Sequence, residues 1–140
     1  RPAPRSPPTG ANQAALETTD TGNSWSQVGI PDANASLYGV DSDATDDVWG
    51  AAGSGTVYHR TGSGWAANAE VGMNDLRDLE VADDDQRGYV VGGSATVFGY
   101  DGSQWAEQST PGSSTLNAVV LGTDATPPIA VGDGGTVIER

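Results

Sequence analysis

One short phrase occurs three times in this chain at a fixed spacing. The copies TGNSW, TGSGW and DGSQW end at Trp25, Trp65 and Trp105, which stand 40 residues apart on each step. A fixed period of this size is typical of a repeat architecture, in which one structural unit is built several times. The repeat restricts the possible folds more than any other feature of the sequence.

Each unit of the repeat offers four short apolar runs separated by turn-rich segments. The first runs cover 37–42, 76–81 and 116–121, the second cover 48–53, 88–93 and 128–133, the third begin with Thr-Val at 56, 96 and 136, and the fourth begin at the repeated Trp. This spacing is expected of strands and hairpins. No stretch sustains a helical period, and 20 of the 140 residues are Gly, which disfavours helices. The sequence therefore predicts an all-β fold.

Four antiparallel strands in a unit of 40 residues are the signature of a β-propeller blade. We expect about three such units, near 16–65, 66–105 and 106–140; a β-sandwich is the main rival. The chain opens with a fourth-type strand after Trp25 and closes with a third-type strand at 136–140, so that pairing of these two strands would close the structure. Propellers typically have four to eight blades. The alternatives are therefore two chains that pool their repeats, three units in an open stack or tight closure, or a fragment of a longer array.

The first 13 residues differ in composition from the repeat domain at 14–140. They hold four of the eight prolines, which cannot donate to a sheet ladder, so we expect an extended or disordered arm. It would act as a linker or would dock on a neighbouring subunit. Because the sequence begins with Arg1, we also expect an upstream segment, either a cleaved signal peptide or one trimmed away.

The charge balance is strongly acidic. Asp and Glu number 19 against six Arg and no Lys, and the formal net charge is −13. Such a surface repels a phosphate backbone, so nucleic acid is excluded as an expected partner. The absence of Lys, together with abundant Asp, resembles proteins of extreme halophiles. No apolar run reaches the roughly 20 residues of a membrane helix, and without Cys the chain has neither disulfides nor thiolate metal sites.

The phrase TTDTGNSW at 18–25 fits the Asp-box pattern, and AVGDGGTV at 130–137 is similar to a turn in the same proteins. The chain thus resembles the blades of BNR/Asp-box propellers and of photosystem II assembly factors over about residues 14 to 140. These repeats occur in sialidases, secreted glycosidases, receptors and surface proteins. The second copy has Arg60 at the Asp position, and the third has Asp101 one residue late. The resemblance implies a fold and no particular activity, because the Asp box is a structural turn.

Physical reasoning gives these repeat positions structural roles. An Asp in such a turn accepts hydrogen bonds from backbone N–H groups, Gly permits a positive φ, and Trp packs between blades. We therefore expect the three Trp residues to be costly to truncate. The structural repeat positions are Asp20, Gly22, Trp25, Gly62, Trp65, Gly102 and Trp105.

Two acidic stretches, DSDATDD at 41–47 and DDD at 83–85, fall between the first and second strands of their units. Oxygen ligands in a loop could hold Ca²⁺. The candidates Asp41, Asp43, Asp46 and Asp47 do not have the EF-hand spacing, and the third unit keeps only Asp124 there. A solvated halophilic surface is the favoured interpretation, with no cofactor, and Ca²⁺ is the alternative.

No constellation in the sequence indicates catalysis. A sialidase-like enzyme would need several converging Arg residues, whereas Arg60, Arg77, Arg87 and Arg140 are scattered over different loops. His59 lies within a predicted strand and has no Ser-His-Asp signature around it, so we expect it to pack. We therefore predict a non-enzymatic interaction or structural module, extracellular or on a cell or virion surface of a halophile. It would contact protein or glycan, with Tyr38, Tyr58 and Tyr100 as candidate ligand-facing residues, and would form a homo-oligomer or larger assembly. A secreted glycan-active enzyme of the sialidase-like type is the alternative.

Overall fold

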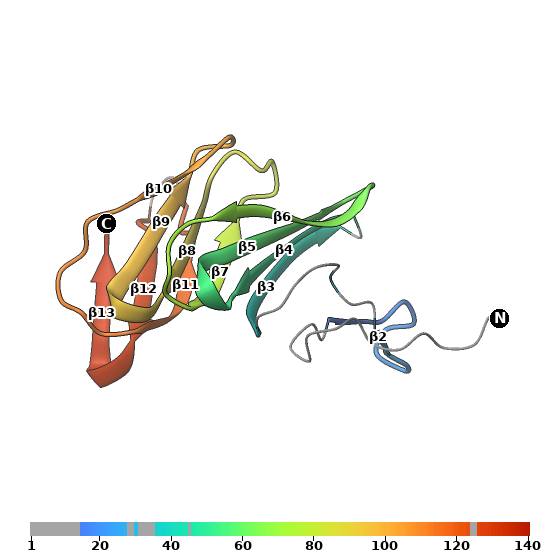
Figure 1. The fold of residues 1–140 in the computed structure, drawn as a ribbon, viewed down its shortest axis with the longest axis horizontal. Coiled ribbons are helices and arrows are strands. Elements are labelled where there is room, and N and C mark those ends of the chain that lie inside the picture. The colour runs from blue at the N-terminus through green and yellow to red at the C-terminus, as the bar shows by residue number, and fades with distance from the viewer. Residues whose placement is uncertain (1–14, 28–29, 31–35, 45, 124–125) are drawn as a thin grey trace.

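The computed structural model describes residues 15–27, 30, 36–44, 46–123 and 126–140, and these residues form an all-β structure (Figure 1). It contains four antiparallel sheets, and its helical content is limited to three single-turn 3-10 segments. None of the helices in the described part of the chain is long and apolar enough to cross a membrane. The expected Pro-rich arm lies outside the described residues.

Two of the sheets have four strands in sequential order. The first sheet consists of β3 (Leu37–Ala44), β4 (Asp47–Ala52), β5 (Thr56–Thr61) and β6 (Gly64–Glu70). The second sheet consists of β7 (Leu76–Val81), β8 (Gly88–Gly92), β9 (Thr96–Tyr100) and β10 (Trp105–Glu107). The predicted four-stranded antiparallel unit is therefore confirmed for both.

The remaining strands form two smaller sheets. The third sheet has β11 (Leu116–Val120), β12 (Ile129–Gly132) and β13 (Thr136–Glu139). The N-terminal hairpin pairs β1 (Leu16–Glu17) with β2 (Ser26–Gln27).

The three larger sheets repeat one another in register as well as in strand order. The leading Leu of each first strand lies opposite the same position of the second strand, and an irregularity follows it each time; the pairs are Leu37 with Ala52, Leu76 with Gly92, and Leu116 with Gly132. A 3-10 turn with one left-handed residue then joins the second strand to the third. That residue is Ser54, Ser94 or Gly134, at φ values of 58°, 55° and 67°. Equivalent residues of the units can therefore be compared directly.

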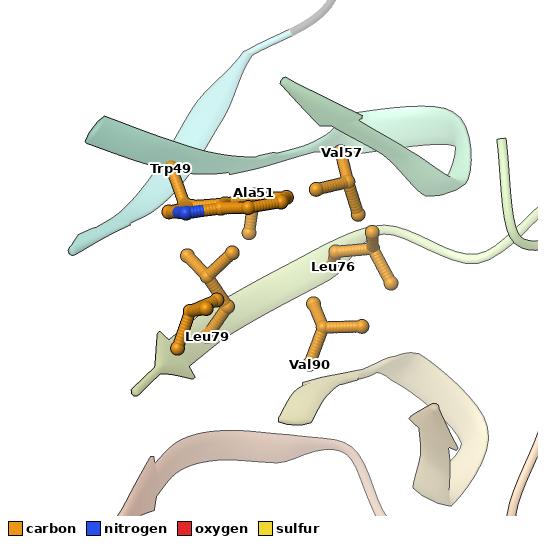
Figure 2. Packing of buried hydrophobic residues seen from close by; sticks show 7 residues of the cluster. Trp49, Ala51, Val57, Leu76, Leu79 and Val90 are labelled. Atoms are coloured by element: carbon orange, nitrogen blue, oxygen red, sulfur yellow. The ribbon is translucent and has the colours of Figure 1, made fainter. Parts of the chain in front are cut away.

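The sheets stack face to face, and apolar side chains fill the spaces between them. Trp49, Ala51 and Val57 of the first sheet meet Leu76, Leu79 and Val90 of the second (Figure 2). Val91 of the second sheet packs with Leu116, Val119 and Ala130 of the third. Both interfaces exclude water, because most of these side chains are almost completely buried.

The first strands of successive sheets lie next to each other and are joined by carboxylates. The Oδ2 atom of Asp41 in β3 accepts a hydrogen bond from the Val81 amide of β7 at 2.8 Å. From β7, Asp78 accepts from the Val119 amide at 2.9 Å and Glu80 accepts from the Leu121 amide. These amides belong to or adjoin β7 and β11, so acidic side chains here serve the fold.

The expected closure between the two ends is not formed. Among the described residues β13 pairs with β12 alone, whereas β2 pairs with β1. The hairpin lies beside β3, while β13 lies at the opposite end of the stack (Figure 1). The three larger sheets lie between β2 and β13, so this arrangement corresponds to an open stack.

Candidate functional site

A cluster of polar side chains lies where the first and second sheets meet at their loops. Asp47 begins β4, His59 lies in β5, and Asp85 lies in the turn between β7 and β8. One possible ligand atom from each lies within 4.8 Å of the others, and all three side chains are partly buried. The Nε2 atom of His59 lies 3.0 Å from Oδ1 of Asp47. We call these three residues the Asp-His cluster.

Trp49 holds two members of the cluster in place. It lies directly opposite His59 in the β4–β5 ladder, and the indole and imidazole rings stack with centroids 3.7 Å apart and an interplanar angle of 13°. Its indole N–H donates to Oδ1 of Asp85 at 3.2 Å. Trp49 is 1% exposed, so this scaffold is rigidly packed. Tyr100 and Trp105 of the second sheet continue the aromatic contacts, with centroids 5.3 Å and 6.1 Å from that of Trp49.

The ionisation of several groups is altered at this junction. Partial burial raises the pKa of Asp85 above its ordinary value; the hydrogen bond from Trp49 opposes this change, and the negative charge of Asp47 adds to it. Desolvation of the carboxyl group, followed by the hydrogen bond and charge of Asp83, raises the pKa of Asp43 to about 6. Desolvation also raises the pKa of Tyr100. Negative charge is therefore crowded along both loops.

The four Asp residues proposed for calcium do not converge on one site. Asp41 is engaged with the Val81 amide, Asp46 is exposed, and Asp43 faces Asp83 of the neighbouring unit. Only Asp47 joins the Asp-His cluster. The two acidic stretches nevertheless meet each other, because the sheets that carry them are stacked.

The three Tyr residues expected to face a ligand have different environments. Tyr58 is 5% exposed and packs with Ile30 and Ala52, so the expectation is wrong for this residue. Tyr38 is 42% exposed and lies beneath the guanidinium of Arg77, whose Cζ atom is 4.6 Å from the ring centroid. Tyr100 is partly buried beside Trp49 and Trp105.

The Asp turns have the predicted geometry at two of the three copies. Asp20 accepts from the Ser24 amide at 2.8 Å, and Gly22 has a φ of 89°. Asp101 accepts from the amides of Ser103 and Gln104, and Gly102 has a φ of 96°. These hydrogen bonds lower the pKa of both Asp residues, with the Ser24 side chain giving the largest effect on Asp20 and the Gln104 amide the largest on Asp101. In the second copy the positive φ, 102°, is found at Gly64 and not at Gly62.

The expected burial of the repeated Trp residues is wrong for Trp25, which is 60% exposed. Trp65 and Trp105 are partly buried. The indole of Trp105 donates to Oδ1 of Asn68 at 2.9 Å, whereas the buried indole N–H of Trp65 has no partner among the described residues. The fourth Trp, Trp49, is the one that is fully buried, and it stands outside the repeated phrase.

Chemically, the Asp-His cluster offers one imidazole nitrogen and two carboxylates, a set able to bind a metal ion or to bind and release protons. Sequence reasoning missed Asp85 and the role of His59. A signal was present, since the only His of the chain stands two strands from one acidic stretch and one period from the other. The comparisons with known proteins give no match to a family model, to a curated protein or to a solved structure.

Proposed function

We propose that this chain is a non-enzymatic interaction or structural module built from propeller-type blades, and that it works by stacking its outer sheet faces against a neighbouring subunit. Its place is outside the cell or on a cell or virion surface of a halophile, as its acidic, Lys-free composition favours. The stacking of successive sheets through their first strands supports the propeller-type description. So does the repeated strand order and register.

The observation that carries the proposal is a pair of residues that repeats in every larger sheet. Ala51 with Val57, Val91 with Val97, and Val131 with Val137 are equivalent pairs between second and third strands. The first two pairs are covered by the next sheet. In the third sheet Val131 is 41% exposed and Val137 is 67% exposed. The third sheet therefore presents a face of the kind that packs against another sheet elsewhere in the molecule.

This face is also more apolar than its internal counterparts. Val120 stands where the other first strands carry Asp41 and Glu80, the carboxylates that bind the next strand. It is 53% exposed and lies next to Val119, which packs in the opposite direction against the second sheet. Three exposed Val side chains on one face favour burial against another apolar surface.

The first sheet has the complementary unfilled face. Val40 is the equivalent of Leu79 and Val119, which are 2% and 6% exposed, yet it is 67% exposed. Beside it a cavity of about 620 Å³ separates the N-terminal hairpin from β3, with Leu16 and Leu37 among its lining residues. A contact between the third sheet of one subunit and the first sheet of another is heterologous, so it forms a ring or a filament.

The scattered Arg residues support a non-enzymatic role. Arg60 pairs with Glu17 at 2.8 Å, and Arg140 donates to Tyr89 and Gln108. Arg77 lies over Tyr38. These partners lie on different sheets, so the three guanidinium groups do not converge as a sialidase-like carboxylate site requires.

The test is the molar mass in solution, measured by light scattering in molar KCl over a range of protein concentrations. We expect oligomers whose share rises with concentration, and we expect Val137→Asp to shift the protein towards the monomer because a charge cannot be buried there unpaired. Met73→Asp is the matched control, since Met73 is 93% exposed in the loop between β6 and β7. A strictly monomeric protein, or an unchanged mass for Val137→Asp, would refute the stacking role.

A further inference from the structure

The Asp-His cluster differs from the corresponding place at the next junction between sheets. The register places Arg87, Tyr89 and Gly99 of the second sheet where the first has Asp47, Trp49 and His59. There the Tyr89 hydroxyl accepts a hydrogen bond from Arg140, and no group of metal-ligand residues occurs within the described part of the chain. The repeated fold therefore does not require an Asp-His cluster. It is a local addition at one junction.

The geometry of the cluster suits a small cation held between the two sheets. Zinc binds imidazole nitrogen and carboxylate oxygen at about 2.0 to 2.2 Å, which sets neighbouring ligands roughly 3.3 to 3.6 Å apart in a tetrahedron. His59 Nε2 and Asp47 Oδ1 are 3.0 Å apart, and the three ligand atoms span no more than 4.8 Å. Rotations of exposed side-chain ends suffice to move from one arrangement to the other.

Supporting contacts around the three side chains resemble those that orient metal ligands. The indole ring of Trp49 fixes the plane of the imidazole by stacking, and its N–H donates to one oxygen of Asp85. Asp85 retains its second carboxylate oxygen for another partner. Groups that position ligands in this way are a general feature of protein metal sites.

Charge at the junction also favours a cation. Among the described residues the ion pairs are His59 with Asp47 and Arg60 with Glu17. Asp85 and Asp83 extend the acidic surface, and Asp43 faces Asp83 across the junction. An imidazole alone offsets at most one of these negative charges, whereas a divalent ion would offset two.

We propose that Asp47, His59 and Asp85 bind one divalent transition-metal ion, Zn²⁺ or Mn²⁺, which links the first sheet to the second. The imidazole nitrogen sets this choice, because Ca²⁺ and Mg²⁺ take oxygen ligands whereas Zn²⁺ and Mn²⁺ accept both donors. Three protein ligands leave the remaining coordination positions to water. The site is independent of the stacking faces, since it lies between two sheets of the same chain.

The test begins with protein treated with a chelator and then titrated with MnCl₂ or ZnCl₂ in molar KCl. Because His59 is the only His in the chain, its imidazole protons give a single set of NMR signals. We expect Mn²⁺ to broaden these signals at one equivalent and Zn²⁺ to shift them, and we expect calorimetry to give a stoichiometry near one. Excess Ca²⁺ should leave the His59 signals in place.

Two variants and one control make the assignment specific. Asp85→Asn and His59→Gln should each weaken Mn²⁺ and Zn²⁺ binding at least tenfold, with circular dichroism confirming that both remain folded. Glu107→Gln removes a carboxylate from an exposed position of β10 and should bind metal as the unaltered protein does. No binding at one equivalent, or equal affinities for Asp85→Asn and Glu107→Gln, would overturn the proposal. The Asp47–His59 contact would then be a hydrogen-bonded pair alone.

Discussion

Trp49 and Trp25 show how differently two residues of the same type contribute to this structure. Trp49 is 1% exposed and packs with Ala51, Leu79 and His59, whereas Trp25 is 60% exposed. Equivalents of Trp49 in the other units are Tyr89 and Ile129, so each second strand has a large side chain at this point. The repeat of Trp in the turn phrase marks the period of the chain. Burial depends on which sheet covers each copy.

We expect Trp49→Ala to lower the free energy of unfolding by about 3 to 5 kcal/mol, because it empties a closely packed site. Trp25→Ala should change it by no more than about 0.5 kcal/mol, as exposed substitutions commonly do. Urea unfolding in molar KCl, followed by circular dichroism, measures both. If Trp49→Ala does not fold, Trp49→Phe gives the same comparison with a smaller loss. Equal losses for the Trp49 and Trp25 variants would contradict the assignment of the core.

At the level of strands, the carboxylates between the first strands replace a backbone ladder. Asp78 of β7 accepts from the Val119 amide of β11 at 2.9 Å, and Asp41 makes the equivalent type of contact from β3 to β7. A partly buried amide without an acceptor costs about 1 to 3 kcal/mol. These strands are therefore held together by side chains that composition alone assigns to a solvated surface.

The variant Asp78→Ala should destabilise the protein by about 1 to 3 kcal/mol, since it leaves the Val119 amide unpaired. Asp78→Asn is the matched control, because its side-chain carbonyl can still accept the hydrogen bond, and its loss should be clearly smaller. Hydrogen exchange of the Val119 amide provides the local readout and should be accelerated in Asp78→Ala. Exchange at an unaltered rate in that variant would show that the contact does not protect the amide.

The strands themselves were predictable because they repeat. The run at 76–81 coincides with β7, and the run at 48–53 differs from β4 by one residue at each end. The Gly-rich turns at 53–55, 93–95 and 133–135 coincide with the three 3-10 segments. Short strands with turn residues at a constant period leave little choice of register. The contacts between sheets have no such signal, since they depend on which carboxylate reaches which amide.

For the molecule as a whole, the candidate site was not predictable from the sequence. Asp47 and Asp85 were each visible in an acidic stretch, but their approach to His59 follows from the stacking of two sheets. The repeat could not identify the cluster either, because the equivalent positions carry Arg87 and Gly99. For the same reason, the closure expected from the order of strand types was not formed. Strand order does not determine how far the stack curves.

The acidic surface leads to a prediction about the salt dependence of the whole fold. A net charge of −13 on 140 residues repels itself within a compact structure. The Debye length falls from about 10 Å at 0.1 M salt to about 3 Å at 1 M, so repulsion between exposed carboxylates is largely screened at molar KCl. We expect the Tm to rise by at least about 4 °C over this range, the shift that roughly 1 kcal/mol produces in a domain of this size.

The charge itself can be tested with the double variant Glu107→Lys, Glu139→Lys, which changes two exposed positions outside the Asp-His cluster and moves the net charge by four, from −13 to −9. Its Tm should exceed that of the unaltered protein at 0.1 M KCl and approach it at 2 M, because screening removes the difference. Differential scanning calorimetry on both proteins across the KCl series measures this convergence. A constant difference at all salt concentrations would mean that the two substitutions act through local packing, and a flat Tm for the unaltered protein would mean that carboxylate repulsion does not limit its stability.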